Sequence, residues 1–204
     1  EFPDIANDDS NKSLLMPRGA ILNGKLTEIL PVDLKDPAQI QEFVAHSWYK
    51  QADETKGLHP FDGETAPHFD IGKAKGTRTA IENVDESAKY SWVKSPRWKG
   101  HAVEVGPLAR YVIAYAHGNK EIQEQVNGVL KALDVPITAL FSTLGRTAAR
   151  GLECSWSAHK MRYFFDKLMA NLKGGNFATA NVDSWEPRTW PAAAQGAGYC
   201  EAPR

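Results

Sequence analysis

Residues 136–173 read PITALFSTLGRTAARGLECSWSAHKMRYFFDKLMANLK, with no proline after the first position. The run stops at Gly174-Gly175, a common way for a helix to end. We therefore predict one very long helix over 136–173, about 57 Å in length and opened by Asp134 and Pro136. Apolar side chains recur along it at helical spacing: Leu140, Leu144, Ala148, Leu152, Trp156, Tyr163, Leu168 and Leu172. Four of these are expected to be mostly buried: Leu140, Leu144, Trp156 and Leu168.

Two shorter helices are predicted immediately before the long one. The first spans 107–117 and ends at Gly118, the position after the C-cap where glycine is favoured. The second spans 119–133, and Asn119 is a suitable N-cap because its side-chain oxygen can accept from a free backbone N–H. Three helices joined by short turns predict an antiparallel helical bundle over 106–175.

The remaining segments predict a small β region and long irregular loops around this bundle. Residues 1–36 are expected to form β and turn structure, because Asn23-Gly24 between two apolar runs is a hairpin signal. Asp36 and Pro37 suggest a helix over 37–51. Apolar residues in 52–105 show no sustained helical or strand periodicity. This segment therefore predicts irregular structure, with a short strand around 90–93. Residues 176–204 predict an extended tail. The fold class expected for this single segment is α+β, mostly α.

Composition excludes several classes of protein. The 204 residues carry 24 Lys and Arg against 25 Asp and Glu, a net charge of −1, which argues against a generally basic nucleic-acid-binding protein. The longest apolar runs fall short of the roughly 18 residues that span a bilayer, and no signal peptide is visible. Cys154 and Cys200 form no Cys-x-x-Cys pair. The chain opens without Met. Both of its ends look cut.

Two stretches of the irregular region carry chemically capable side chains. Residues 59–68 hold two imidazoles and two carboxylates, His59, Asp62, Glu64 and His68, which can bind a divalent metal. Their spacing matches no compact metal motif, so a hydrogen-bonded turn is favoured. Residues 89–99 hold four cations interleaved with aromatic rings and no acid. A solvated or partner-facing surface is favoured there over a nucleic-acid site.

Three further groups of residues are weaker candidates. His101 and Glu104 precede a helix and can form a proton relay, but contact of Glu104 with the helix N-terminus, and of Arg110 with a neighbouring carboxylate, is favoured. In the long helix, Arg146, Arg150 and Glu153 lie three or four residues apart and can pair. Cys154 resembles a small buried hydrophobic residue. The last nine residues, 196–204, combine small residues with a terminal arginine suited to binding an anion.

Taken together, seven stretches resemble the large subunit of nickel-iron hydrogenases, and their details resemble the membrane-associated uptake type. They occur in one order over nearly the whole chain: LLMPRGA (14–20), HSWY (46–49), LHPFDG (58–63), YSWVKSPR (90–97), GH with EVGPLAR (100–110), TLGRTAAR (143–150) and GAGYCEAPR (196–204).

The resemblance also implies what the chain lacks. In the family, two Cys-x-x-Cys motifs hold nickel and iron, and neither is present. The sequence is therefore interpreted as an interior segment of the large subunit with no metal ligand of its own. Its matching site residues are Ala202, Pro203 and Arg204. They imply a tail that reaches the active site, an arginine guanidinium over the open side of the metal pair, and a Pro-Arg backbone that helps hold a diatomic ligand on iron.

The activity that the resemblance implies is reversible oxidation of H2 to protons and electrons. The implied cofactor is a nickel-iron centre with CN and CO ligands, and the implied partners are the rest of the subunit and a small subunit carrying iron–sulfur clusters. The implied location is the periplasmic side of the cytoplasmic membrane, attached through the partner complex. The segment alone is expected to be inactive. A helical binding module without catalysis and a nonheme metalloprotein using His59, Asp62, Glu64 and His68 are the alternatives.

Overall fold

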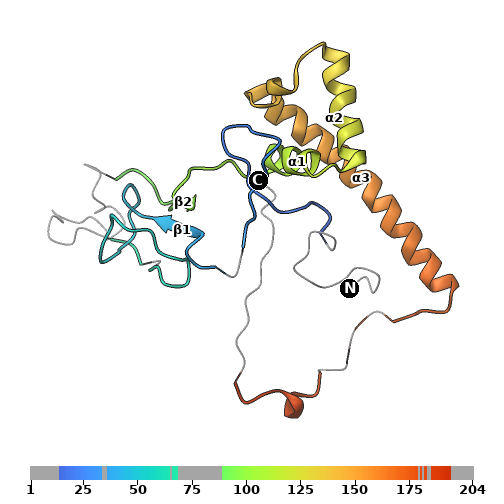
Figure 1. The fold of residues 1–204 in the computed structure, drawn as a ribbon. Coiled ribbons are helices and arrows are strands. Elements are labelled where there is room, and N and C mark those ends of the chain that lie inside the picture. The colour runs from blue at the N-terminus through green and yellow to red at the C-terminus, as the bar shows by residue number, and fades with distance from the viewer. Residues whose placement is uncertain are drawn as a thin grey trace, which may run out of the picture. The chain divides into compact units, whose positions relative to one another are not determined.

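The structure of the chain is a computed structural model that describes residues 14–33, 36–64, 66–68, 89–178, 180, 182 and 185–193. The chain divides into two units. A helical unit comprises residues 1–31 and 105–204, and a loop unit comprises residues 32–104. Figure 1 shows the α-helices in the first unit and the two short strands in the second. The class is therefore mixed: the described residues form three α-helices and one two-stranded antiparallel sheet.

The first two helices lie where the sequence predicts them. Helix α1 spans Pro107–Ala116, and Gly118 follows it with a positive φ of 80°. Helix α2 spans Lys120–Leu133, and the Asn119 side chain accepts from the backbone N–H of Ile122 at 3.2 Å. Both ends are set by local chemistry, because a glycine reaches the left-handed conformation without strain and an asparagine satisfies a free donor.

The third helix is shorter than predicted. Helix α3 spans Thr143–Lys173, 31 residues, and does not include residues 136–142. There the chain forms a 3-10 turn, η3, at Ile137–Leu140. Ser142 then starts α3, since its hydroxyl accepts from the N–H of Gly145 at 3.0 Å and donates to the carbonyl of Ala139 at 2.7 Å. Helix α3 therefore begins after the Ser142 cap, and not at the start predicted from Asp134 and Pro136. Figure 1 shows α2 and α3 running in opposite directions on either side of η3.

The core of the helical unit lies around α1, which packs against both α2 and α3. Leu140 and Trp156 are buried as predicted. The prediction is wrong for Leu144, which is 81% exposed, and for Leu168, which is also exposed. Helix α1 is about 15 Å long and α3 about 46 Å, so α1 covers only part of its longer neighbour. The largest cluster of buried residues is Met16, Leu108, Tyr111, Val112, Ala114, Ile122, Val126, Leu140, Ala149 and Trp156.

Residues 14–31 belong to this unit although they precede α1 by a long stretch of chain. The carbonyl of Arg18 lies 3.1 Å from Nε2 of His117 at the end of α1. A Cβ on Gly19 would lie 3.3 Å from Ile113 and 2.6 Å from Ile29. The predicted Asn23-Gly24 turn is confirmed: both residues have positive φ, and Lys25 N–H donates to the Leu22 carbonyl at 3.1 Å. The segments that flank this turn do not form the expected strands. Among the described residues, their only β pairing is an isolated antiparallel bridge between Ala20 and Leu30.

The loop unit contains a strand where the sequence predicts a helix. Strand β1, Ile40–Phe43, pairs antiparallel with β2, Ser95–Trp98, so the helix predicted over 37–51 is wrong. Asp36 does cap a turn, accepting from the N–H of Ala38 at 3.0 Å, but the helix does not continue. Instead, the buried Gln39 accepts from the indole N–H of Trp98 at 3.2 Å. A contact 59 residues away thus overrides the local helix signal. The strand predicted around 90–93 is wrong: Ser91 forms only an isolated bridge to Ser47, and β2 begins at Ser95.

Candidate functional site

The terminal motif cannot be placed by the structure. Residues 194–204 lie outside the described part of the chain, and they include Cys200 and the predicted site residues Ala202, Pro203 and Arg204. The outer-shell role of Arg204 stays a prediction, as does the extended course of the tail beyond residue 193. In the described part of that tail, Pro187–Thr189 forms a short 3-10 turn, η4.

The alternative metal site at residues 59–68 is a hydrogen-bonded turn in the structure. The carbonyl of His59 accepts from the N–H of Asp62 at 2.8 Å and from that of Gly63 at 3.1 Å. Nδ1 of His59 faces the N–H of Phe61 at 3.3 Å, whereas His68 faces the carboxylate of Glu54. The two imidazoles therefore have separate partners. Among the described residues, no group of three or more His, Cys, Asp and Glu side chains is arranged to hold a metal ion.

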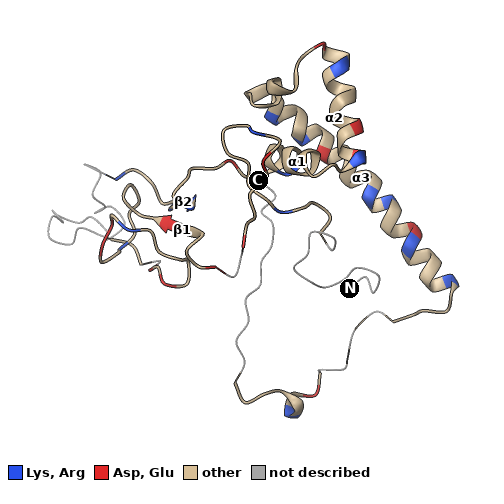
Figure 2. Ribbon diagram, viewed as in Figure 1, with Lys and Arg blue, Asp and Glu red and all other residues tan. Residues whose placement is uncertain are grey.

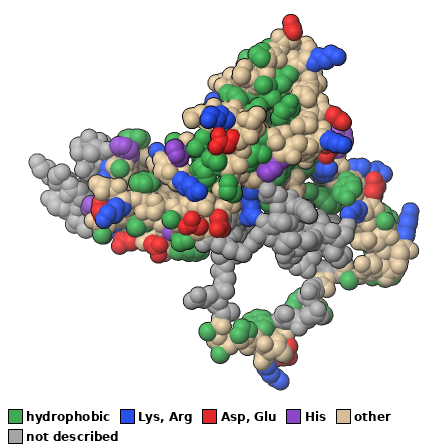
Figure 3. Space-filling view, in the orientation of Figure 1, with side chains coloured by type: hydrophobic (Ala, Val, Ile, Leu, Met, Phe, Trp, Pro, Cys, Tyr) green, Lys and Arg blue, Asp and Glu red, His purple; other side chains and the backbone are tan. Residues whose placement is uncertain are grey.

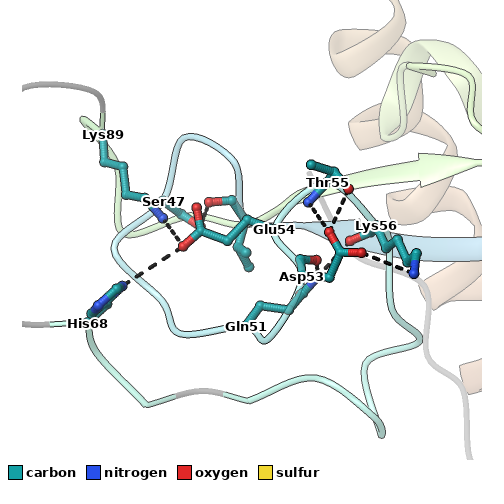
Figure 4. A network of polar contacts seen from close by, with 9 residues as sticks. Ser47, Gln51, Asp53, Glu54, Thr55, Lys56, His68 and Lys89 are labelled. Carbon is teal, nitrogen blue, oxygen red and sulfur yellow. Dashed lines mark hydrogen bonds and ion pairs between the residues drawn. The ribbon is translucent and has the colours of Figure 1, made fainter.

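A polar network surrounds residues 51–56 of the loop unit (Figure 4). One carboxylate oxygen of Glu54 lies 2.7 Å from Nζ of Lys89 and 3.9 Å from Nδ1 of His68. Asp53 accepts from the hydroxyl and the N–H of Thr55 and pairs with Lys56 at 3.0 Å. The Thr55 hydroxyl, followed by Lys56, lowers the pKa of Asp53 to about 2. Both acids are thus held as partnered carboxylates, which suits a structural role.

Two of the four cations in the basic aromatic stretch at 89–99 pair with carboxylates that lie outside the stretch. Lys89 pairs with Glu54, and Lys94 pairs with Glu42 at 3.4 Å while lying 5.5 Å from the centre of the Tyr49 ring. Lys99 lies over the Trp98 ring at 5.1 Å. A cation engaged in this way has less attraction for a phosphate backbone. The surface predicted for this stretch, solvated or facing a partner, stays a prediction.

An ion pair with two nitrogen–oxygen contacts joins α1 to α3 in the helical unit. Nε of Arg110 lies 2.5 Å from one Glu153 oxygen, and its terminal nitrogen lies 2.8 Å from the other. The predicted pairing of Arg110 with a neighbouring carboxylate is confirmed, and that carboxylate is Glu153 on the facing helix. Beside it, the buried Tyr111 donates to the amide oxygen of Gln125 at 2.8 Å. Burial, and then the charges of Glu153 and Glu121, raise the pKa of Tyr111. Nothing local in the sequence indicates a pair that spans 43 residues.

We expect Glu153→Gln in the full-length subunit to lower the free energy of unfolding by about 3 kcal/mol, because it removes the carboxylate charge that the mostly buried Arg110 contacts through two nitrogens. The matched control is Glu121→Gln, since Glu121 pairs with Lys160 at 2.8 Å across α2 and α3 but is more exposed. That change should cost less than about 1 kcal/mol. Figure 2 shows the charged positions of these helices. Thermal unfolding of both variants checks the difference, and equal losses would contradict it.

Cys154 is exposed on α3, so the prediction of a buried cysteine is wrong. Within the described ranges, no helix is both long enough and apolar enough to span a bilayer.

Comparisons with known proteins give a consistent result over the whole chain. A family model described as nickel-dependent hydrogenase matches residues 1–204. The uptake hydrogenase large subunits of Bradyrhizobium diazoefficiens and Rhizobium leguminosarum bv. viciae are each 60% identical over 100% of this chain and 34% of their own length. The hydrogenase-1 large chain of Escherichia coli is 53% identical with the same coverage. The chain thus spans about a third of the length of these relatives.

Solved structures give the same likeness at lower sequence identity. A NiFeSe hydrogenase of Desulfomicrobium baculatum matches with a TM-score of 0.53 and 26% identity, over 79% of this chain and 29% of that one. The NiFeSe hydrogenase of Desulfovibrio vulgaris Hildenborough in the reduced state matches with a TM-score of 0.52 and 26% identity, over 86% and 31%. The likeness in fold therefore extends over most of this chain and under a third of each solved structure.

Proposed function

Because the chain belongs to the nickel-dependent hydrogenase family, we propose that it is part of the catalytic large subunit of an enzyme that oxidises H2 reversibly to protons and electrons. The observation that carries this proposal is the match over all 204 residues, with relatives 60% identical that are named uptake hydrogenase large subunits. A non-catalytic helical binding module would not account for that identity outside the helices. The segment alone is expected to be inactive.

The cofactor proposed for the intact enzyme is a nickel-iron centre with CN and CO ligands on iron. When bound, it supplies the site at which the H–H bond is cleaved heterolytically. The described residues offer no set of ligands for it, and Cys154 is a lone exposed thiol on α3. In the family that the sequence resembles, two Cys-x-x-Cys motifs hold the metals, and the 204 residues contain no such motif, so we propose that its ligands come from elsewhere in the intact subunit.

The contribution proposed for this chain is an outer set of donors from Ala202, Pro203 and Arg204. A guanidinium is planar and always charged, so it can hold a fixed positive charge and directed N–H donors beside a dry site. Backbone N–H groups of the same stretch can donate to a negatively charged diatomic ligand. Small residues in 196–198 would allow the backbone to approach closely.

The proposed partners are the remainder of the large subunit and a small subunit whose iron–sulfur clusters accept the electrons. The proposed location is the periplasmic side of the cytoplasmic membrane, where the complex would be peripheral. Support for a small subunit comes from the relatives, which are named large subunits. Support for the location comes only from the uptake type that the sequence resembles.

The test is to purify the full-length subunit with its small subunit and to measure nickel, iron and H2-dependent reduction of a redox dye. We expect both metals and dye reduction that requires H2. A complex that lacks nickel, or that reduces no dye under H2, would contradict the proposal. A second sample carries His59→Ala and His68→Ala, and we expect it to retain its nickel and iron. Loss of both metals from that sample would favour the alternative site at 59–68.

A further inference from the structure

We propose that α3 carries a second packing face, an apolar seam that is covered by a helix from the remaining part of the large subunit. The seam consists of Cys154, Ala158, Met161, Phe165, Leu168 and Leu172. The inference rests on the proposed function, because it takes the chain to be part of a longer large subunit. It goes further in naming the surface that joins this segment to the rest of that subunit, and the kind of element that binds there.

The seam is one continuous face, because its members lie on a single helix at alternating spacings of four and three residues. Residues at these spacings are neighbours on a helix surface. Trp156 marks the opposite side of α3, since it is buried in the core cluster of the helical unit. At about 100° per residue, Met161 lies about 140° and Phe165 about 180° around the helix from Trp156. The seam therefore faces away from the core that α3 shares with α1.

The seam is exposed along its length in the described part of the chain. Met161 is 74% exposed, Phe165 and Leu168 are each 52% exposed, and α3 contains no buried residue after Trp156. Figure 1 shows this half of α3 extending past α1 and α2, and Figure 3 shows hydrophobic side chains beside Lys and Arg on its visible face. The seam is about 27 Å long. Contiguous apolar surface of that extent marks a contact site more often than a solvated surface.

The spacing of the seam favours a helix as the element that covers it. Alternating steps of four and three residues are the pattern by which two helices interlock their side chains along a common line, with their axes about 20° apart. The small residues Cys154 and Ala158 lie at one end of the seam, and the larger Met161 and Phe165 follow them. A partner helix can therefore approach α3 most closely near Cys154. Covering the whole seam takes a helix of about 18 residues.

Two cations on the sides of α3 already have partners within this chain. Nε of Arg162 donates to the carboxylate of Asp166 at 3.0 Å, and its guanidinium lies 5.7 Å from the centre of the Phe165 ring. Nζ of Lys160 donates to the carboxylate of Glu121 on α2 at 2.8 Å. An apolar centre with polar residues at its edge is the usual composition of a protein–protein contact. The covering helix is therefore expected to be apolar on the side that meets the seam.

The rest of the large subunit is favoured over the small subunit as the source of this helix. The chain spans 34% of the length of its relatives, so about twice as much further chain is tethered to it. Tethering gives a segment a high effective concentration at its binding site. Exposed large apolar side chains also continue past α3 into the described part of the tail, at Phe177, Trp185 and Trp190. Cover over so long a stretch is more readily given by the chain's own subunit than by one separate partner.

The test is the rate at which a maleimide labels Cys154, read from its peptide by mass spectrometry. The samples are the isolated full-length large subunit, the heterodimer, and the large subunit unfolded in urea. We expect labelling in both folded samples to be about a hundredfold slower than in the unfolded one, at high and at low protein concentration. Fast labelling in both folded samples would overturn the inference. Fast labelling in the isolated subunit alone would assign the seam to the small subunit, and protection lost on dilution would assign it to a second copy; either result would also overturn it.

Two variants of the isolated large subunit locate the protection on the seam. Met161→Asp places a carboxylate within it and should raise the labelling rate of Cys154 at least about tenfold. The matched control is His159→Asp, an exposed position about 160° around the helix from Met161, and it should leave the rate unchanged. Equal rates in the two variants would overturn the inference, and the wild-type samples decide if Met161→Asp fails to fold. Absence of H2-dependent dye reduction by the wild-type complex would instead mark failure of the proposed function.

Discussion

Arg204→Lys in the full-length enzyme is expected to lower H2 turnover about a hundredfold, the typical effect of removing a directed donor from a charged reaction site. The substitution retains the positive charge but replaces a planar fork of donors by a mobile, strongly hydrated ammonium. Since Arg204 is proposed to act without ligating either metal, nickel and iron content should stay at the wild-type level. The measurements are metal analysis and H2-uptake kinetics on the same preparation.

Two results would contradict the proposed role of Arg204. Normal turnover with full metal content would show that the arginine is only structural. Loss of nickel and iron together with turnover would show that it is needed to assemble the site. Arg188→Lys is a matched control, because Arg188 is an exposed arginine in η4 of the same tail, paired with Glu186 at 3.7 Å. It should leave both turnover and metal content unchanged.

Gly145→Ala is expected to destabilise the full-length subunit by about 3 kcal/mol, the upper range for forcing extra volume into a packed site. A Cβ at residue 145 would overlap the backbone carbonyl oxygen of Leu140 and lie 2.6 Å from the Leu140 Cα. Backbone atoms cannot move aside as the end of a flexible side chain can. The turn at η3 would therefore have to separate from the start of α3.

The same helix supplies the control for this substitution. Gly151 also lies within α3, but it is exposed and a Cβ there would meet nothing within 4 Å. Gly151→Ala should stabilise the subunit by up to about 1 kcal/mol through helix propensity alone. Unfolding midpoints of the two variants should thus move in opposite directions from the wild type. Shifts of the same sign and size would show that η3 does not pack on Gly145 in the intact subunit.

Local chemistry explains which features of the fold could be predicted from the sequence. The ends of α1 and α2 depend on Gly118 and Asn119, whose effects act within a few residues. The turn at Asn23-Gly24 likewise needs only two residues with positive φ. The prediction for the start of α3 is wrong because Asp134 ends α2 in the left-handed conformation, and Ser142, eight residues later, caps α3.

Contacts between residues that are distant in sequence explain the features of the fold that the sequence did not predict. Residues 37–51 carry a valid helix start, but pairing of Ile40 with Trp98 and the bond from Trp98 to Gln39 hold them as a strand. Burial of Arg110 and Glu153 against one another also depends on how α1 meets α3. For the candidate site, resemblance of 196–204 to a family motif identified Arg204, whereas composition and spacing alone gave only a weak anion-binding signal there.

The contact between Arg18 and His117 has a consequence for synthesis of the chain on the ribosome. The two residues are 99 positions apart, and all of the loop unit is made between them. At about 5–20 residues per second, the segment around Met16 and Gly19 waits roughly 5–20 s before α1 exists to receive it. During that interval the contacts that this segment makes with α1 cannot form, so residues 14–31 must stay accessible until residue 117 has been made.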